Sequence, residues 1–227
     1  MKHNIQHNEV INGILYKNLT EEYRLAIIDF YFDVFLKDEP TTVAAGGYTT
    51  RDPNIIKQIE DIIDDGLSVI ALDPDKDNKL IGMMISHAVD KDQVDPRSSH
   101  EENLKTFPPL HASIMTLFDE IMYPGDIFER NPQDKKYHDM FTLATSSGYR
   151  GRGIGRTLVA ESLKMAKKAD CDAAIVLATS DFSRKIFDKL GFEVIASKNW
   201  EDCIYNGELA FGHNVPSANA TAHYLKL

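Results

Sequence analysis

The glycine-rich segment from Arg150 to Arg156, RGRGIGR, has the residue types of an anion-binding turn. Glycine lets the backbone approach a ligand closely, and a helix that begins here would present free N–H groups and the positive end of its dipole. Positions 150 to 168 hold six basic residues and one acidic residue, in a chain whose net charge is −10. The segment therefore indicates a site for a phosphate-bearing ligand.

Two common nucleotide-binding motifs do not fit this segment. The dinucleotide fingerprint G-x-G-x-x-G would need its third glycine where the chain has Arg156. A Walker A loop needs Gly-Lys followed by Ser or Thr, and the segment contains no lysine. The ligand must therefore be held by a different kind of turn.

The elements around the turn alternate between strand and helix. Hydrophobic periodicity and turn residues predict strands over 11–17, 67–72, 79–89, 137–145, 173–178, 193–197 and 220–226. Helices are predicted over about 21–37, with Thr20 as N-cap and with Leu25, Ile28, Phe32 and Phe35 on one face, and over 52–65, 113–122, 154–169 and 182–190. The polar residues 90–102 should form an exposed excursion. No repeat or linker divides the chain, so we expect one domain over residues 1–227, with a mixed α/β sheet and at least one parallel crossover.

The turn R-x-x-G-x-G and the later segment ATSDFSRKIFDKLGFEV together resemble two motifs of the GNAT superfamily of acetyl-CoA-dependent N-acetyltransferases. They cover about residues 141–194. The resemblance implies the GNAT fold, a central mixed, mostly antiparallel sheet of about seven strands that is splayed at the acetyl-CoA site and flanked by helices. It also implies that acetyl-CoA is the phosphate-bearing ligand.

The resemblance implies which residues hold acetyl-CoA. Backbone groups at the end of the strand would contact the pantetheine arm, and the turn would cradle the pyrophosphate. The implied cofactor residues are Leu143, Ala144, Thr145, Arg150, Gly151, Arg152, Gly153, Ile154, Gly155, Arg156 and Ser180. Many members have a tyrosine that protonates the leaving thiolate; this chain has Phe187 at that position, so that step does not transfer.

The segment FLKDEP, residues 35–40, resembles the F-x-K-D-E-P segment of insect-type arylalkylamine N-acetyltransferases, which act on dopamine, serotonin, octopamine and tryptamine. The segments IFER at 127–130 and TSDFS at 179–183 agree with this resemblance. It implies that Glu39 is the general base and that Thr179 and Ser183 assist it. Two positions depart from the family pattern, because Thr41 replaces the usual leucine and Thr179 replaces a serine.

A carboxylate at Glu39 also suits the chemistry of an amine acceptor. An alkylammonium with a pKa near about 10 must lose a proton before it attacks a thioester, and a carboxylate beside the cofactor can take that proton. Phe35 adjoins Glu39 and is a candidate for the amine pocket, although aromatic residues at helical spacing are usually core. His87 and His138 are competing candidates for the base because both lie on or beside predicted central strands.

The remaining composition limits the partners. No histidine spacing suggests a metal site, the acidic net charge disfavours nucleic acid, and Cys171 and Cys203 are expected to stay reduced. The longest apolar run, Ala173–Ala178, is too short to span a membrane, and the first residues lack a signal-like apolar region. We therefore expect a cytoplasmic protein, either a monomer or a homodimer, and the resemblance implies that it acts on a small-molecule amine. Two alternatives remain open, a polyamine or other aliphatic amine acceptor and a non-catalytic acyl-CoA-binding module.

Overall fold

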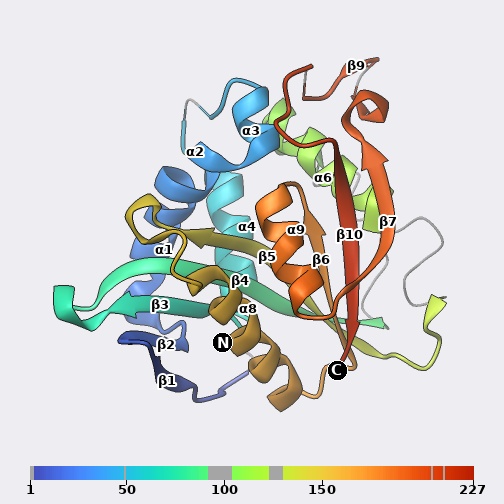
Figure 1. Ribbon diagram of the computed structural model, residues 1–227. Coiled ribbons are helices and arrows are strands. Elements are labelled where there is room, and N and C mark those ends of the chain that lie inside the picture. Colours follow the sequence, from blue (N-terminus) through green and yellow to red (C-terminus); the bar gives the residue numbers. More distant parts are fainter. Residues whose placement is uncertain (1–2, 49, 92–103, 123–129, 206, 212) are drawn as a thin grey trace.

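The computed structural model describes residues 3–48, 50–91, 104–122, 130–205, 207–211 and 213–227, and the structural statements below concern these residues. An eight-stranded sheet with the order β1-β2-β3-β4-β5-β6-β10-β7 forms the centre of the molecule (Figure 1). Its strands are β1 Asn8–Ile11, β2 Ile14–Asn18, β3 Val69–Asp73, β4 Lys79–Asp90, β5 Lys136–Thr145, β6 Ala173–Ala178, β7 Glu193–Asn199 and β10 Asn219–Lys226. A small hairpin, β8 Ile204–Tyr205 and β9 Glu208–Leu209, lies outside the sheet. The predicted mixed, mostly antiparallel sheet is confirmed, with eight strands in place of about seven.

The extra strand comes from the segment predicted as one strand over residues 11–17. Asn12 and Gly13 both have positive φ angles, of 51° and 78°, and form a two-residue hairpin turn between β1 and β2. Asn-Gly is the most favourable pair for such a turn because both residues tolerate the left-handed conformation. The prediction of a single strand here was wrong.

Strands β5 and β6 form the parallel pair of this sheet, and they separate at one end. Their pairing covers only Tyr137–Asp139 of β5 and Ala173–Ile175 of β6. On its other side β5 carries an extra residue opposite β4, where the register moves from Ile85–Thr142 to His87–Asp139. A bulge of this kind bends the strand that carries it. The ends of β5 and β6 near Thr145 and Ala178 therefore lie apart, which confirms the predicted splay.

Helices cover both faces of the sheet (Figure 1). The helices are α1 Arg24–Phe30, α2 Leu36–Asp38, α3 Pro40–Ala44, α4 Pro53–Ile63, α6 Pro109–Met122, α8 Ile154–Lys168 and α9 Asp181–Lys189, with a π-helical turn η2 over Tyr31–Phe35. Single 3₁₀ turns are η1 Glu21–Tyr23, η3 Pro74–Lys76, η5 Ser147–Tyr149 and η6 Trp200–Asp202. Helices α8 and α9 pack on one face, and α1, α4 and α6 pack on the other. None of the helices in the described ranges is both long and apolar enough to cross a bilayer.

The predicted helix over residues 21–37 begins as the 3₁₀ turn η1 and differs from the structure in two further ways. It contains the π-helical turn η2, which rotates the following residues relative to an ideal α-helix. Leu25, predicted on one face with Ile28 and Phe32, is 77% exposed, whereas Ile28 and Phe32 are buried. The helical path ends at Asp38, because Glu39 is extended before Pro40, as the proline predicted. The short helix α3 that begins at Pro40 was not predicted.

Candidate active site

A cleft of about 930 Å³ opens where β5 and β6 separate. One end, here called the turn end, is lined by the glycine-rich turn, the start of α8 and one side of α9. The other end, here called the α6 end, is lined by η2, α6 and β5. Glu39 and Thr179 also line the cleft. The volume is sufficient for a large ligand at the turn end together with a small one at the α6 end.

The glycine-rich turn leaves its surface open to a ligand. Gly151 and Gly153 have left-handed φ angles of 75° and 80°, and a side chain at either would meet no other protein atom within 4 Å. The first backbone hydrogen bond of α8 runs from Thr157 N to Gly153 O, at 3.0 Å. The N–H groups of the first helical residues therefore lack partners within the helix. Such a turn can bind an anion through its backbone.

Basic side chains surround the same end of the cleft. Arg156, Lys185 and Lys189 line it and form no ion pair with the described carboxylates. Arg150 also lines the cleft, but its guanidinium is paired with Asp38 and its Nε donates to Thr145 O at 3.3 Å. These cations suit a ligand with several negative charges.

Most of the residues predicted for the cofactor line this cleft, including Leu143, Ala144, Thr145, Ile154, Gly155 and Ser180. Arg152 does not. Its guanidinium lies 5.4 Å from the ring centroid of Tyr149 and outside the lining. Gly155 has a packing role, because a Cβ there would lie 3.2 Å from Ile186 Cδ1 of α9.

Glu39 lies at the start of α3 with a buried carboxylate that is 7% exposed. Oε1 accepts from Thr41 N at 3.2 Å and from Thr179 Oγ1 at 2.8 Å. Oε2 accepts from Thr41 Oγ1 at 2.6 Å and from Thr42 N at 2.7 Å. Four donors therefore occupy the four acceptor positions of the carboxylate. Glu39 is thus a helix cap held in a fixed orientation, not a solvated helix-end residue.

The predicted hydroxyl residues divide into two groups. Thr179, at the end of β6, is brought to Glu39 by the hydrogen bond given above. The hydroxyl of Ser183 does not contact Glu39. Its Oγ lies 3.0 Å from Ser180 O and 2.9 Å from Ser180 Oγ, within the first turn of α9. Ser180 caps that helix by accepting from Ser183 N at 3.1 Å. Thr179 and Ser183 both line the cleft, but only Thr179 contacts the carboxylate.

The α6 end of the cleft is mainly apolar and aromatic. Its lining includes Tyr31, Phe35, Ile114, Met115 and Phe141. The rings of Tyr31 and Phe35 lie one π-helical turn apart, with centroids separated by 5.2 Å. Phe35 therefore lies in the lining of the cleft, and its role in an amine pocket stays a prediction.

His111 is the histidine of the α6 end. Its Nδ1 lies 3.0 Å from Tyr48 Oη and its Nε2 lies 2.7 Å from Gln58 Oε1. Burial lowers the pKa of His111 to about 4. The imidazole is therefore neutral near pH 7, with both nitrogens hydrogen-bonded away from a ligand.

The other candidate bases do not line the cleft. His138 is fully buried under α8, where its Nε2 lies 2.7 Å from Ser162 Oγ, and burial lowers its pKa to about 3. His87 lies opposite Asp139 in the β4–β5 ladder and is also absent from the lining. Phe187, at the position of the missing tyrosine, does line the cleft, but it is only 1% exposed and packs on Phe192 with a centroid distance of 5.3 Å.

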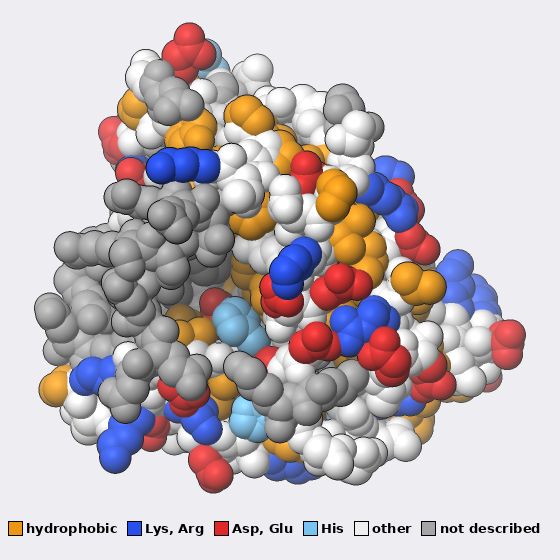
Figure 2. Space-filling view, turned by 180° about the vertical axis from the view of Figure 1, so that it is seen from behind, with side chains coloured by type: hydrophobic (Ala, Val, Ile, Leu, Met, Phe, Trp, Pro, Cys, Tyr) orange, Lys and Arg blue, Asp and Glu red, His pale blue; other side chains and the backbone are white. Residues whose placement is uncertain are grey.

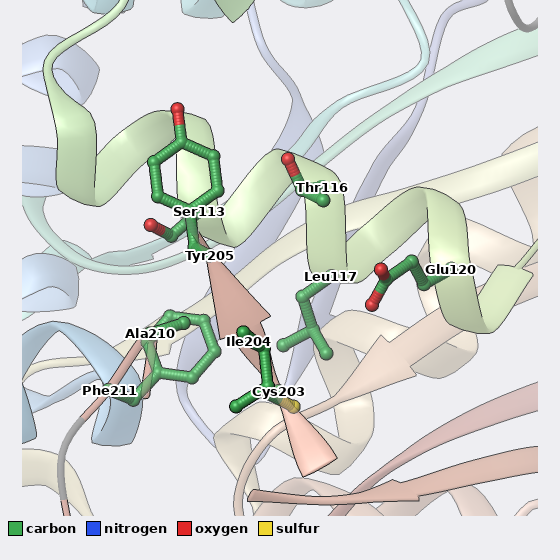
Figure 3. A pocket seen from close by; sticks show the side chains of 9 residues that line it. All are labelled: Ser113, Thr116, Leu117, Glu120, Cys203, Ile204, Tyr205, Ala210 and Phe211. Atoms are coloured by element: carbon green, nitrogen blue, oxygen red, sulfur yellow. The ribbon is translucent and has the colours of Figure 1, made fainter. Parts of the chain in front are cut away.

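The structure also contains a second, much smaller cavity between α6 and the segment around β8 and β9 (Figure 3). It holds about 10 Å³ and includes Cys203 and Leu117 in its lining, which leaves space for no more than a water molecule. Burial raises the pKa of the Cys203 thiol to about 11 and that of Cys171 to about 12. Both cysteines are free and buried, as expected for packing residues.

Acidic and basic side chains lie close together on the face of the molecule shown in Figure 2. Within the described ranges, no group of three His, Cys, Asp or Glu side chains is arranged to hold a metal ion. Residues 92–102 of the predicted excursion and residues 127–129 of the IFER segment lie outside the described residues.

Sequence reasoning missed several residues of the site. Thr41 was noted only as a departure from a family pattern, and Thr42 and Tyr31 were not noted. The contact of Asp38 with Arg150 joins positions separated by 112 residues, so no local pattern could have indicated it. The side chains of α6 were missed because an apolar helical stripe looks the same whether it faces a core or a ligand.

Comparison with known proteins supports the fold and the family. Arylalkylamine N-acetyltransferase 2 from Aedes aegypti has a TM-score of 0.84 at 20% identity, covering 95% of this chain and 99% of that one. A mosquito arylalkylamine N-acetyltransferase like 5b has a TM-score of 0.83 at 21% identity, covering 94% and 100%. The Drosophila melanogaster polyamine N-acetyltransferase that forms N-acetylagmatine has a TM-score of 0.79 at 14% identity, again covering 94% and 100%.

These identities are low, so the three structures show a shared fold and leave the acceptor open. The model of the acetyltransferase (GNAT) family matches residues 29–192, well over half of the chain and including both ends of the cleft. The chain belongs to the GNAT family of acetyltransferases, whose members use acetyl-CoA as acetyl donor.

Proposed function

We propose that this protein is an arylalkylamine N-acetyltransferase that acetylates the primary amine of small amines of the dopamine, serotonin, tryptamine and octopamine class. One observation carries the proposal most directly. The buried carboxylate of Glu39 stands beside an apolar, aromatic end of the cleft, while a cationic glycine-rich turn forms the other end. Such a site suits an amine with one positive charge and an apolar body.

The turn end fits acetyl-CoA, which supplies an acetyl thioester when it is bound. The open faces of Gly151 and Gly153 and the free N–H groups at the start of α8 suit a pyrophosphate. Arg156, Lys185 and Lys189 add charge for the phosphate groups. Backbone groups of Leu143–Thr145, along the splayed strand β5, would pair with the pantetheine arm.

Glu39 would act as the general base through Thr179. All four acceptor positions of the carboxylate are occupied, so an incoming ammonium has no vacant carboxylate lone pair to use directly. The Thr179 hydroxyl lines the cleft and already donates to Oε1. It can accept the proton of the ammonium while its own proton moves to Glu39, leaving a neutral amine to attack the thioester carbonyl.

The reverse transfer would complete the cycle. As the carbon–sulfur bond breaks, Thr179 can give its proton to the thiolate and recover one from protonated Glu39, while the second proton of the amine nitrogen is released to solvent. Ser183 also lines the cleft and is a second donor for the same step. A hydroxyl donor is needed because Phe187 has no acidic proton.

The charge of the α6 end favours an arylalkylamine over a polyamine. The described carboxylates that line the cleft are Asp38, Glu39 and Asp181. Asp38 is paired with Arg150, and Asp181 lies at the start of α9, 3.6 Å from Arg184. Glu39 is thus the described carboxylate next to the apolar end. A second ammonium or a guanidinium would be desolvated there without an anionic partner, which is unfavourable.

A panel of amines tests the acceptor class. Steady-state kcat/KM should be highest for tryptamine, dopamine or octopamine and at least about tenfold lower for spermidine and agmatine, because an unpaired buried cation costs more than about 1.4 kcal/mol. A preference for spermidine or agmatine would overturn the acceptor assignment. Acetyl-CoA binding without turnover of any amine would instead favour the non-catalytic module.

The role of Glu39 is tested by Glu39→Gln, which keeps the shape of the side chain. We expect an unchanged Kd for acetyl-CoA and a fall in kcat/KM of ~10²-fold or more, as for loss of a general base. Raising the pH should partly rescue the variant, because more of the amine then arrives neutral. If the variant stays within threefold of the parent from pH 6.5 to 9.5, Glu39 is not the base.

A further inference from the structure

We propose that Ser217 is a positioning residue that holds the hydroxyl of Thr179 against Glu39. The proposal rests on the proposed function, in which Thr179 carries a proton between the amine and Glu39. Ser217 Oγ donates to the backbone oxygen of Thr179 at 2.7 Å, and Thr179 Oγ1 donates to Glu39 Oε1 at 2.8 Å. Ser217 therefore contacts the backbone of the residue whose side chain would carry the proton.

Thr179 lies where the sheet gives β6 little support. On one side, the ladder between β6 and β10 ends at the pair of Ala178 with Thr221, one residue before Thr179. On the other side, β6 pairs with β5 only over residues 173–175. Ser217 lies in the segment just before β10, and its hydroxyl donates to a carbonyl that lies beyond both ladders. This hydrogen bond thus extends the attachment of β6 by one residue, at Thr179 itself.

The indole of Trp200, in η6, holds Ser217 in turn. Trp200 Nε1 donates to Ser217 Oγ at 3.2 Å, so the serine oxygen accepts one hydrogen bond and donates another. Trp200 is 7% exposed and packs in an apolar cluster with Leu117 of α6 and with Phe211, whose ring centroid lies 5.7 Å from that of Trp200. The chain of contacts from Trp200 through Ser217 to Thr179 therefore joins the end of β6 to the core.

Ser217 also lines the cleft, whereas Trp200 does not. A direct contact between Ser217 and a substrate is therefore the alternative role, and the two roles have different consequences. A residue that acts through the Thr179 hydroxyl has no effect on the rate once that hydroxyl is removed. A residue that contacts a substrate keeps its effect. A double-mutant cycle between Ser217→Ala and Thr179→Val distinguishes the two roles.

The experiment measures kcat and KM for the best acceptor of the amine panel in the parent, Ser217→Ala, Ser217→Thr, Thr179→Val and the double variant. We expect kcat of Ser217→Ala to fall about fivefold, which corresponds to about 1 kcal/mol for one lost hydrogen bond. Ser217→Thr retains the hydroxyl and should recover most of the parental kcat. In the Thr179→Val background, Ser217→Ala should leave kcat nearly unchanged. The Kd for acetyl-CoA should be the same in the parent and in Ser217→Ala, because the phosphate groups would bind at the turn end.

Two further variants complete the design. Trp200→Phe removes the donor to Ser217 Oγ and keeps an aromatic ring in the cluster, so kcat should fall about two- to threefold, and only where Thr179 is present. Ser113 is the matched control, because its Oγ donates to Pro109 O at 2.9 Å within α6 and it does not line the cleft. Ser113→Ala removes a hydrogen bond of the same kind and should leave kcat at the parental value.

Two results would overturn the proposal. Ser217→Ala could have the kcat of the parent, or it could lower kcat by the same factor with and without the Thr179 hydroxyl, which would indicate a substrate contact or a general loss of structure. If Thr179→Val is impaired while either result holds, only the role of Ser217 is wrong. If Thr179→Val is as active as the parent, the proposed proton path is wrong, and the role of Ser217 is wrong with it. If no amine of the panel is acetylated, the proposed function itself is wrong.

Discussion

Replacement of Gly153 by alanine should have two effects that can be measured separately, a loss of stability from backbone strain and a loss of affinity for acetyl-CoA. Gly153 has a φ of 80° and lines the cleft, and an added Cβ would meet no protein atom within 4 Å. The added methyl group causes no internal clash. The free energy of unfolding of the variant should therefore fall by about 1–2 kcal/mol, because alanine disfavours the left-handed conformation. In a chain of this size that cost lowers Tm by about 2–8 °C. The methyl group also occupies the space in which a phosphate would approach the backbone, so the Kd for acetyl-CoA should rise at least about tenfold.

Gly13 provides the matched control for this experiment. It has a φ of 78°, nothing lies within 4 Å of its added Cβ, and it lies in the turn between β1 and β2, outside the cleft lining. Gly13→Ala should show a similar fall in Tm with an unchanged Kd. Differential scanning calorimetry and isothermal titration calorimetry measure the two quantities. If Gly153→Ala and Gly13→Ala bind acetyl-CoA equally well, the glycine-rich turn is not the pyrophosphate site.

Three further perturbations test the site and its surroundings. Lys185→Gln should weaken acetyl-CoA binding several-fold and make the Kd less dependent on salt, whereas Lys57→Gln, which removes a pair with Asp61 on α4, should change neither. The free energy of unfolding should fall between pH 7 and pH 5, and in His138→Gln this fall should be about 2 kcal/mol smaller than in the parent, as measured by denaturant titration. The unfolded state binds a proton below about pH 6.5 that buried His138, with its pKa of about 3, does not bind, so the stabilisation is lost as the pH falls. Phe187→Tyr should leave kcat within a few-fold of the parent; a large gain would mean that the parent lacks an adequate acid.

Elements with strong local signals were predicted closely. Strand β6 has the predicted bounds, Ala173–Ala178, and α8 ends one residue before the predicted position. The continuous apolar run of β6, and the apolar periodicity of α8 with the glycines before it, are properties of adjacent residues, so a single sequence reveals them. Helix α3 was missed because its sequence, PTTVA, contains three β-branched residues with low helix propensity. The cap supplied by Glu39 and the proline at its first position compensate for that propensity.

The candidate site was predictable in part only. The glycine-rich turn could be interpreted from physical principles, because free N–H groups, glycines and cations are adjacent in the sequence. The contact of Glu39 with Thr179 spans 140 residues and depends on how far β5 and β6 separate. No local pattern encodes that separation, so the two residues were linked only through the family resemblance. The separate position of the Ser183 hydroxyl likewise depends on the cap formed by Ser180.

The hydrogen bonds of Glu39 determine how a proton can reach its carboxylate. Four donors fix the position of the carboxylate and hold the start of α3, and they leave none of its four acceptor positions free. The proton that Glu39 accepts must be returned before the next turnover. The shared hydroxyl of Thr179 permits that return, because it can carry the proton in both directions. The proposed mechanism therefore requires Thr179→Ser to retain most of the activity and Thr179→Val to lose about as much kcat as Glu39→Gln. An active Thr179→Val would mean that the amine reaches the carboxylate by displacing a donor.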